Sequence, residues 1–249
     1  MNFQRRIRSR LAALAPADKS RLYQLGERLG LPRARRLLQP ALWGSLRRRS
    51  PFPSGRIRRG TPVFTHYSDR FFDRHCDDIV GEVLEAGSAG LSRRSSGAVS
   101  SVEVIGTVVD DDEITIYGEL DACGLLPEAR FDTAVIPGAL GSTRDLGQAI
   151  ANVMSSLSPG GVLLATVPVV GPVSGDGTGG ERWHVPPAAL ERIARDACPG
   201  ADVSVEALGC LPGQVAATVG LAAEELRDTE LWSDDRRHPV VSGLRVVRP

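Results

Sequence analysis

Beyond residue 60, the apolar residues of the chain fall into short continuous runs bounded by glycine, proline and charged residues. Runs of about four to eight residues are typical of strands in a parallel sheet, because helices cover both faces of such a sheet. The clearest run is 161–167, which follows a Ser-Pro-Gly-Gly turn. Seven strands are predicted in total: 81–85, 101–105, 114–117, 131–136, 161–167, 202–207 and 239–247.

Segments with apolar residues at helical spacing separate most of these strands. A capped lead-in from Thr61 is followed by a helix to about Asp78, and further helices are predicted over 143–157, 186–197 and 215–226. Strands that alternate with helices indicate an α/β fold with a doubly wound sheet. We therefore predict a mostly parallel, seven-stranded sheet within residues 60–249.

The first 59 residues have a different composition. Leucine and isoleucine recur at helical spacing over 3–15 and 18–29, a third short helix is predicted over 32–39, and an arginine-, proline- and glycine-rich linker follows. The net charge of the chain is zero, yet residues 1–60 hold 16 of the 30 lysines and arginines and only two acidic residues. We expect a basic helical arm (1–59) joined to an acidic domain (60–249).

The charge of the arm leaves two interpretations open. The arm attaches the protein to an acidic partner or surface, or it is solvated or folded against the acidic domain of its own chain. No aromatic stacking pattern accompanies the arginines, which favours the second interpretation and argues against nucleic acid as a partner.

The remaining composition excludes several classes of protein. Four cysteines are scattered without any C-x-x-C pair, which predicts reduced thiols and neither a metal site nor a disulfide framework. No apolar run reaches the roughly 18 residues of a membrane-spanning helix. We therefore expect a soluble, cytoplasmic protein without a transmembrane segment.

The candidate chemistry begins at the end of the first predicted strand. Glu85 closes that strand, and Gly87 lies in the turn of small residues that follows. Such a turn at the carboxyl edge of a parallel sheet lets a nucleoside cofactor lie against the backbone, where a side chain would hold the ligand away. An ordinary strand–turn connection is the alternative for this motif.

Three further segments carry a resemblance to a known family. They are Arg59-Gly-Thr-Pro-Val63, Pro159-Gly-Gly-Val-Leu-Leu-Ala-Thr-Val-Pro168 and a helix predicted at Leu221–Leu226. From about Arg59 to its end, the chain resembles class I S-adenosylmethionine-dependent methyltransferases, in particular a small bacterial branch. The resemblance implies a Rossmann-like methyltransferase fold, S-adenosyl-L-methionine as cofactor and a transferase activity.

The resemblance also assigns cofactor contacts. It implies that Glu85 and Gly87 are the first acid and first glycine of the cofactor-binding motif. It places Glu103 at the end of the second strand, where an acid accepts hydrogen bonds from both ribose hydroxyls. Glu119, or Asp121 if the register differs by two, would face the adenine amino group. Ile136 would lie beneath the transferable methyl group.

The chain departs from the family pattern at three points. Ala89 replaces the second glycine, polar residues are missing after the fourth strand, and Trp183-His-Val-Pro186 stands where relatives have W-R-F-T. These departures put catalysis in doubt more than they put the fold in doubt.

Candidate catalytic and acceptor-binding residues come from two segments. Methyl transfer is an in-line displacement that depends mainly on positioning, so a base is needed only when the acceptor is a hydroxyl. His184 is the candidate base, because imidazole accepts a proton at neutral pH. Trp183 and Tyr67 are candidates for contact with the acceptor. The alternatives are a surface or capping histidine, a tryptophan that fixes its loop to the core, and a partly buried tyrosine that contacts no ligand.

Three functions are compatible with the sequence to different degrees. The first is transfer of a methyl group to a small-molecule or saccharide hydroxyl, a form of O-methylation. The second is a non-catalytic methyltransferase-like domain that binds a partner or serves as a scaffold through its basic arm. The third, a nicotinamide-dependent oxidoreductase, is disfavoured because no G-x-G-x-x-G follows the first strand.

Overall fold

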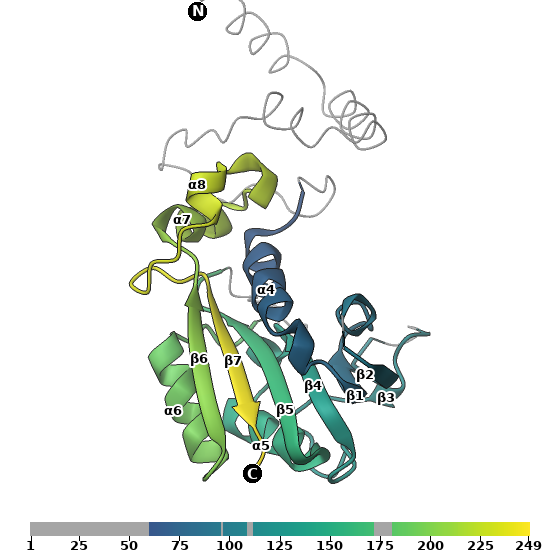
Figure 1. Cartoon of the computed structure of the whole chain (residues 1–249). Helices are drawn as coiled ribbons and strands as arrows, with labels where there is room; N and C mark the ends of the chain where they lie inside the picture. The colour runs from purple at the N-terminus through teal and green to yellow at the C-terminus, as the bar shows by residue number, and fades with distance from the viewer. Residues whose placement is uncertain (1–59, 96, 109–111, 172–180) are drawn as a thin grey trace, which may run out of the picture.

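The computed structural model describes residues 60–95, 97–108, 112–171 and 181–249. It contains a seven-stranded sheet in the order β3-β2-β1-β4-β5-β7-β6 (Figure 1). The strands are β1 (Gly81–Ala86), β2 (Val99–Gly106), β3 (Ile116–Tyr117), β4 (Phe131–Pro137), β5 (Leu157–Pro168), β6 (Asp202–Leu208) and β7 (Val241–Val247). The helices predicted over 3–15, 18–29 and 32–39 and the glycine-rich segment 175–180 lie outside the described residues.

The direction of the strands confirms the predicted fold class. Strands β1 to β5 are mutually parallel, and β7 is antiparallel to both of its neighbours, β5 and β6. From β1 the chain builds outward to β2 and β3, whereas β4 and β5 lie on the other side of β1. The strand order therefore reverses between β1 and β4, and the crevice outside their carboxyl ends is where open α/β sheets bind ligands.

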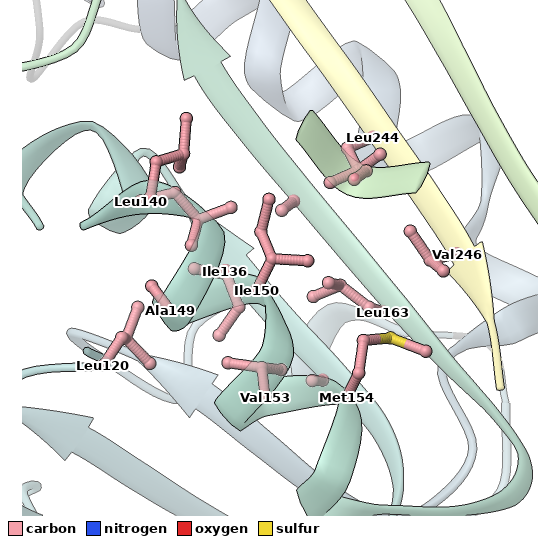
Figure 2. Packing of buried hydrophobic residues seen from close by; sticks show 14 of the residues in the cluster. Leu120, Ile136, Leu140, Ala149, Ile150, Val153, Met154, Leu163, Leu244 and Val246 are labelled. Carbon is pink, nitrogen blue, oxygen red and sulfur yellow. The ribbon is translucent and has the colours of Figure 1, made fainter. Parts of the chain in front are cut away.

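Helices cover the two faces of the sheet because successive strand residues point to opposite sides. In β1, Val83 packs into the cluster of α4 (Val63–Arg74), whereas Leu84 belongs to the cluster on the other face, with α5 (Leu146–Ser156) and α6 (Pro187–Ala197). Figure 2 shows Ile150 and Val153 of α5 beside Ile136 and Leu163 of the sheet. Both faces are therefore apolar, as the continuous apolar runs predicted.

The carboxyl-terminal third of the chain corrects one predicted helix. Helix α7 runs over Leu211–Val219 and ends at Gly220, whose φ of 77° is left-handed. Residues Ala223–Glu225 form a separate 3-10 turn, η4, in which the Glu225 carboxylate accepts a hydrogen bond from the Ala222 amide at 2.8 Å. The helix expected over 215–226, including Leu221–Leu226, is wrong because a left-handed glycine ends a helix.

One more short helix completes this end of the molecule. Helix α8 spans Asp228–Leu231 and was not predicted. Figure 1 shows α7 and α8 beyond the ends of β6 and β7, next to the first turns of α4. In the part of the chain that the structure describes, no helix combines the length and the apolar character that membrane crossing requires.

Ion pairs fix α4 to the outer strands of the sheet. Asp234 pairs with Arg70 at 3.0 Å and with Arg74 at 3.2 Å, and Arg74 also pairs with Glu206 of β6 at 2.8 Å. Arg245 of β7 reaches back to the Asp78 carboxylate at 2.8 Å. These partners are far apart in the sequence, so the network holds the lead-in helix in one position relative to the sheet.

Candidate functional site

The turn after β1 is organised by a buried carboxylate. Glu85 is 1 % exposed, and its two oxygens accept hydrogen bonds from the Leu91 and Ser92 amides, both at 2.9 Å, and from the Ser92 hydroxyl. Hydrogen bonds to a charged group contribute about 1.5–3 kcal/mol each. Glu85 therefore holds the segment from Gly87 to Ser92 in one conformation, and its bonding capacity is largely used within the protein.

Gly87 has the geometry expected of a glycine that lies against a ligand. Its φ is 87°, which disfavours residues with a side chain, and its amide donates to the Ile105 carbonyl at 2.9 Å. A Cβ atom built at this position meets no heavy atom within 4 Å. The backbone of the turn is thus accessible from outside, and a cofactor that packs against it fits this part of the site.

The end of β4 lies beside this turn and is tied to α4 and β5. Gly138, with φ 72°, donates its amide to the carbonyl and the hydroxyl of Thr166 at 3.0 and 3.2 Å. The same hydroxyl is 2.7 Å from the Ser68 hydroxyl of α4. Sequence reasoning missed this contact, because Ser68 and Thr166 are polar residues in apolar surroundings without a recognisable motif.

Ile136 occupies the predicted place near the end of β4, but its side chain is completely buried. It packs with α5 in the core shown in Figure 2. Any contact of Ile136 with a cofactor would therefore come from its backbone.

Glu103 is not where the sequence placed it. Strand β2 continues to Gly106, so Glu103 is an interior residue of the strand, opposite Leu84 of β1. Its carboxylate pairs with Arg130, which directly precedes the first residue of β4. The amino ends of parallel strands share one edge, so this ion pair draws the carboxylate away from the carboxyl edge. The expectation that Glu103 ends the strand is wrong.

Glu119 follows β3 at the carboxyl edge, as predicted. Its carboxylate lies 3.4 Å from the Arg144 guanidinium and is 40 % exposed. The Asp121 carboxylate binds the backbone just before α5, where it accepts hydrogen bonds from the Arg144 and Asp145 amides at 2.8 and 3.1 Å. Burial opposes ionisation of Asp121, but these amides hold its pKa below the usual value. Asp121 is therefore bound to the backbone, whereas the Glu119 carboxylate contacts only an exposed arginine side chain in the described hydrogen bonds and ion pairs.

The segment that contains Trp183 and His184 folds onto the ends of β4 and β5. The Arg182 and Trp183 amides donate to the Gly141 carbonyl at 2.7 and 2.9 Å, and the Val185 amide donates to the Pro168 carbonyl at 2.9 Å. The Trp183 indole donates to the Thr143 carbonyl at 2.9 Å and packs on the core. Trp183 therefore fixes its loop, and His184 is held at the same edge of the sheet as Gly138.

Tyr67 belongs to the core. Its side chain is fully buried, and its hydroxyl contacts the Cys210 sulfur at 3.8 Å and the Glu230 carbonyl at 3.5 Å. Burial raises the pKa of this hydroxyl. The predicted contact of Tyr67 with an acceptor is not supported, because α4 places this side chain in the core between the helix and the sheet.

The sequence matches no protein-family model and no curated protein. Among solved structures, it is similar to the complex between the Haloferax volcanii Trm112 methyltransferase activator and a protein assigned as a methyltransferase. That match has a TM-score of 0.51 and 15% identity, and it covers 75% of this chain and 90% of the other.

A second structure, assigned as an S-adenosylmethionine-dependent methyltransferase from Listeria monocytogenes, matches with a TM-score of 0.50 and 9% identity. It covers 74% of this chain and 99% of the other. The chain has the methyltransferase fold. At these identities the similarity establishes the fold alone, because one fold can carry many activities.

Proposed function

We propose that the protein binds S-adenosyl-L-methionine at the carboxyl ends of β1 and β4 and transfers its methyl group to a hydroxyl of a small molecule or saccharide. The turn at Gly87 is the observation that carries the proposal. It lies at the switch point of the strand order, it has a left-handed glycine with open space at its Cβ position, and Glu85 holds it. A cofactor with a nucleoside and an amino acid moiety suits such an edge.

Four residues would hold the cofactor in this proposal. Glu85 orders the turn, Gly87 allows the close approach, Glu119 offers a carboxylate to the adenine amino group, and the Ile136 backbone lies near the reacting end. The cofactor supplies an electrophilic methyl group on a sulfonium sulfur. Catalysis then depends on alignment and on exclusion of water, with His184 as the base that removes the hydroxyl proton.

Calorimetric titration with S-adenosylmethionine and with its demethylated product tests the proposal. We expect saturable binding by the full chain and loss of affinity of at least about a hundredfold in Gly87→Val, because a branched side chain would occupy the approach to the turn. Since a positive φ strains valine wherever it occurs, the matched control is Gly200→Val. Gly200 has φ 86° and no heavy atom within 4 Å of its Cβ position, but it lies between α6 and β6.

The two variants separate strain from ligand contact. The proposal is supported if both variants lose the same amount of stability and only Gly87→Val loses affinity for the cofactor. Equal affinity in both variants would place the cofactor elsewhere. Failure of the wild-type protein to bind either compound would favour a non-catalytic, partner-binding role instead.

A further inference from the structure

A carboxylate lies next to the candidate base. The Glu181 Oε2 atom is 3.2 Å from His184 Nε2, and the two side chains are 35% and 21% exposed. A carboxylate can only accept a hydrogen bond, so Nε2 carries the hydrogen and donates it. Neutral imidazole has one such hydrogen, which leaves the lone pair on Nδ1.

The second ring nitrogen of His184, Nδ1, differs from Nε2 in its surroundings. Among the described residues, the only buried side-chain nitrogen or oxygen without a hydrogen-bond partner is His66 Nε2. No hydrogen-bond partner of His184 Nδ1 is found among the described residues, and the side chain is 21% exposed. The pair therefore has its donor on Nε2, bonded to Glu181, and leaves the lone pair of Nδ1 as the proton acceptor.

The backbone on both sides of His184 is fixed, so Glu181 and His184 are held on a rigid segment. The Arg182 and Trp183 amides bind the Gly141 carbonyl, and the Val185 amide binds the Pro168 carbonyl. In addition, the Val185 carbonyl accepts a hydrogen bond from the Ser242 hydroxyl at 2.7 Å. The Arg182 guanidinium donates to the Ser142 carbonyl at 2.7 Å. These contacts join the segment to β7 and to the turn after β4. Groups held in this way lose little further freedom when they act on a substrate.

A third segment packs directly against the hydrogen bond. A Cβ atom at Gly171, just after β5, would lie 3.3 Å from Glu181 Oε2 and 3.5 Å from His184 Nε2. The glycine thus permits the carboxylate and the imidazole to lie close to the end of β5.

We propose that Glu181 is a positioning residue for the methyl transfer, which fixes the tautomer of His184 so that Nδ1 accepts the proton of the acceptor hydroxyl. The inference rests on the proposed function. A carbon–oxygen bond forms at the hydroxyl oxygen, the carbon–sulfur bond breaks and its electron pair remains on sulfur. The proton passes to Nδ1, and the resulting positive charge on His184 lies beside the Glu181 carboxylate.

Nitrogen-15 NMR of the histidine rings tests the tautomer without cofactor or acceptor. The chain has four histidines, so loss of one signal in His184→Gln identifies the resonance of interest. We expect His184 to carry its hydrogen on Nε2 at a pH where it is neutral. His238 serves as an internal reference for the opposite tautomer, with the hydrogen on Nδ1, because its Nδ1 lies 3.2 Å from the Asp235 carboxylate.

Glu181→Gln should convert His184 to a mixture of both tautomers, because an amide offers a donor and an acceptor. The matched control is Glu191→Gln, which removes the same charge from α6, where Glu191 pairs with Arg195 at 2.8 Å. This control should leave His184 unchanged. A wild-type His184 with its hydrogen on Nδ1, or a tautomer unaffected by Glu181→Gln, would overturn the inference.

Failure of the inference and failure of the proposed function are distinguishable. The titration with S-adenosylmethionine reports on the turn at Gly87, whereas the NMR signals report on the pair at the end of β5. We expect Glu181→Gln to keep cofactor affinity within about threefold, a difference well under 1.4 kcal/mol. A greater loss of affinity would make Glu181 part of the cofactor site and would contradict its role as a positioning residue.

Discussion

Replacement of Glu85 by glutamine tests whether this carboxylate organises the turn after β1. The two oxygens of Glu85 serve the Leu91 and Ser92 amides and the Ser92 hydroxyl in a site that is 1 % exposed. Glutamine keeps one acceptor oxygen and directs an amino group toward donors. Loss of one charge-assisted bond, with a buried donor left unpaired, should cost about 3 kcal/mol.

Urea denaturation measures this cost. With a slope of about 2 kcal/mol per molar urea, the midpoint should fall by about 1.5 M. The control Glu191→Gln removes an exposed pairing worth less than about 1 kcal/mol and should shift the midpoint by less than about 0.5 M. A shift in Glu85→Gln no larger than that of the control would refute the view that the carboxylate holds the turn.

Two further predictions concern His66 and the basic arm. Burial lowers the pKa of His66 below 6.5 and the neighbouring Arg70 acts in the same direction, so the unfolded chain binds this proton more tightly. Stability is therefore complete above the unfolded pKa and falls as the pH drops from about 7 toward the folded pKa, by at most about 1.4 kcal/mol per pH unit. Urea midpoints should show a shallower fall in His66→Phe, and an identical pH dependence would rule out this assignment. Deletion of residues 1–55 should leave the affinity for S-adenosylmethionine within about threefold of that of the full chain. The reason is that attraction between exposed charges is screened over about 8 Å at physiological salt. A truncated protein that is insoluble or melts far below the full chain would show that the arm is structural.

Most of the sheet was predictable because buried strands are locally encoded. Continuous apolar runs identified all seven strands, and alternation with helices gave the fold class. The errors arose at the ends of elements, where a single residue determines whether the helix or strand continues. Gly220 ended α7 early, and Glu103 is an interior residue of β2, which runs on to Gly106 and does not end at its carboxylate.

The parts of the candidate site differ in how far they were predictable. Gly87 and Glu119 were placed correctly relative to their strands, since both depend on residues next to a strand end. The contact of Ser68 with Thr166 joins residues far apart in the sequence, and only the packed α4 and β5 reveal it. The pair of Glu181 and His184 is close in sequence, yet the hydrogen bond depends on a backbone held by Gly141 and Pro168.

The corrected position of Glu103 changes which residue should matter most for cofactor binding. If the ribose were held by Glu103, its replacement by alanine would remove two charge-assisted hydrogen bonds and weaken binding by well over tenfold. In the structure this carboxylate pairs with Arg130, and both side chains are partly exposed, at 25% and 44%.

Glu103→Ala should therefore cost less than about 1 kcal/mol of stability and leave the affinity for S-adenosylmethionine within about threefold. The turn at Gly87 must then provide much of the binding, so Gly87→Val should be the far more damaging variant in the same calorimetric titration. The reverse order, with Glu103→Ala more damaging than Gly87→Val, would mean that the cofactor reaches the interior of β2. The carboxyl ends of β1 and β4 would then be the wrong place for the site.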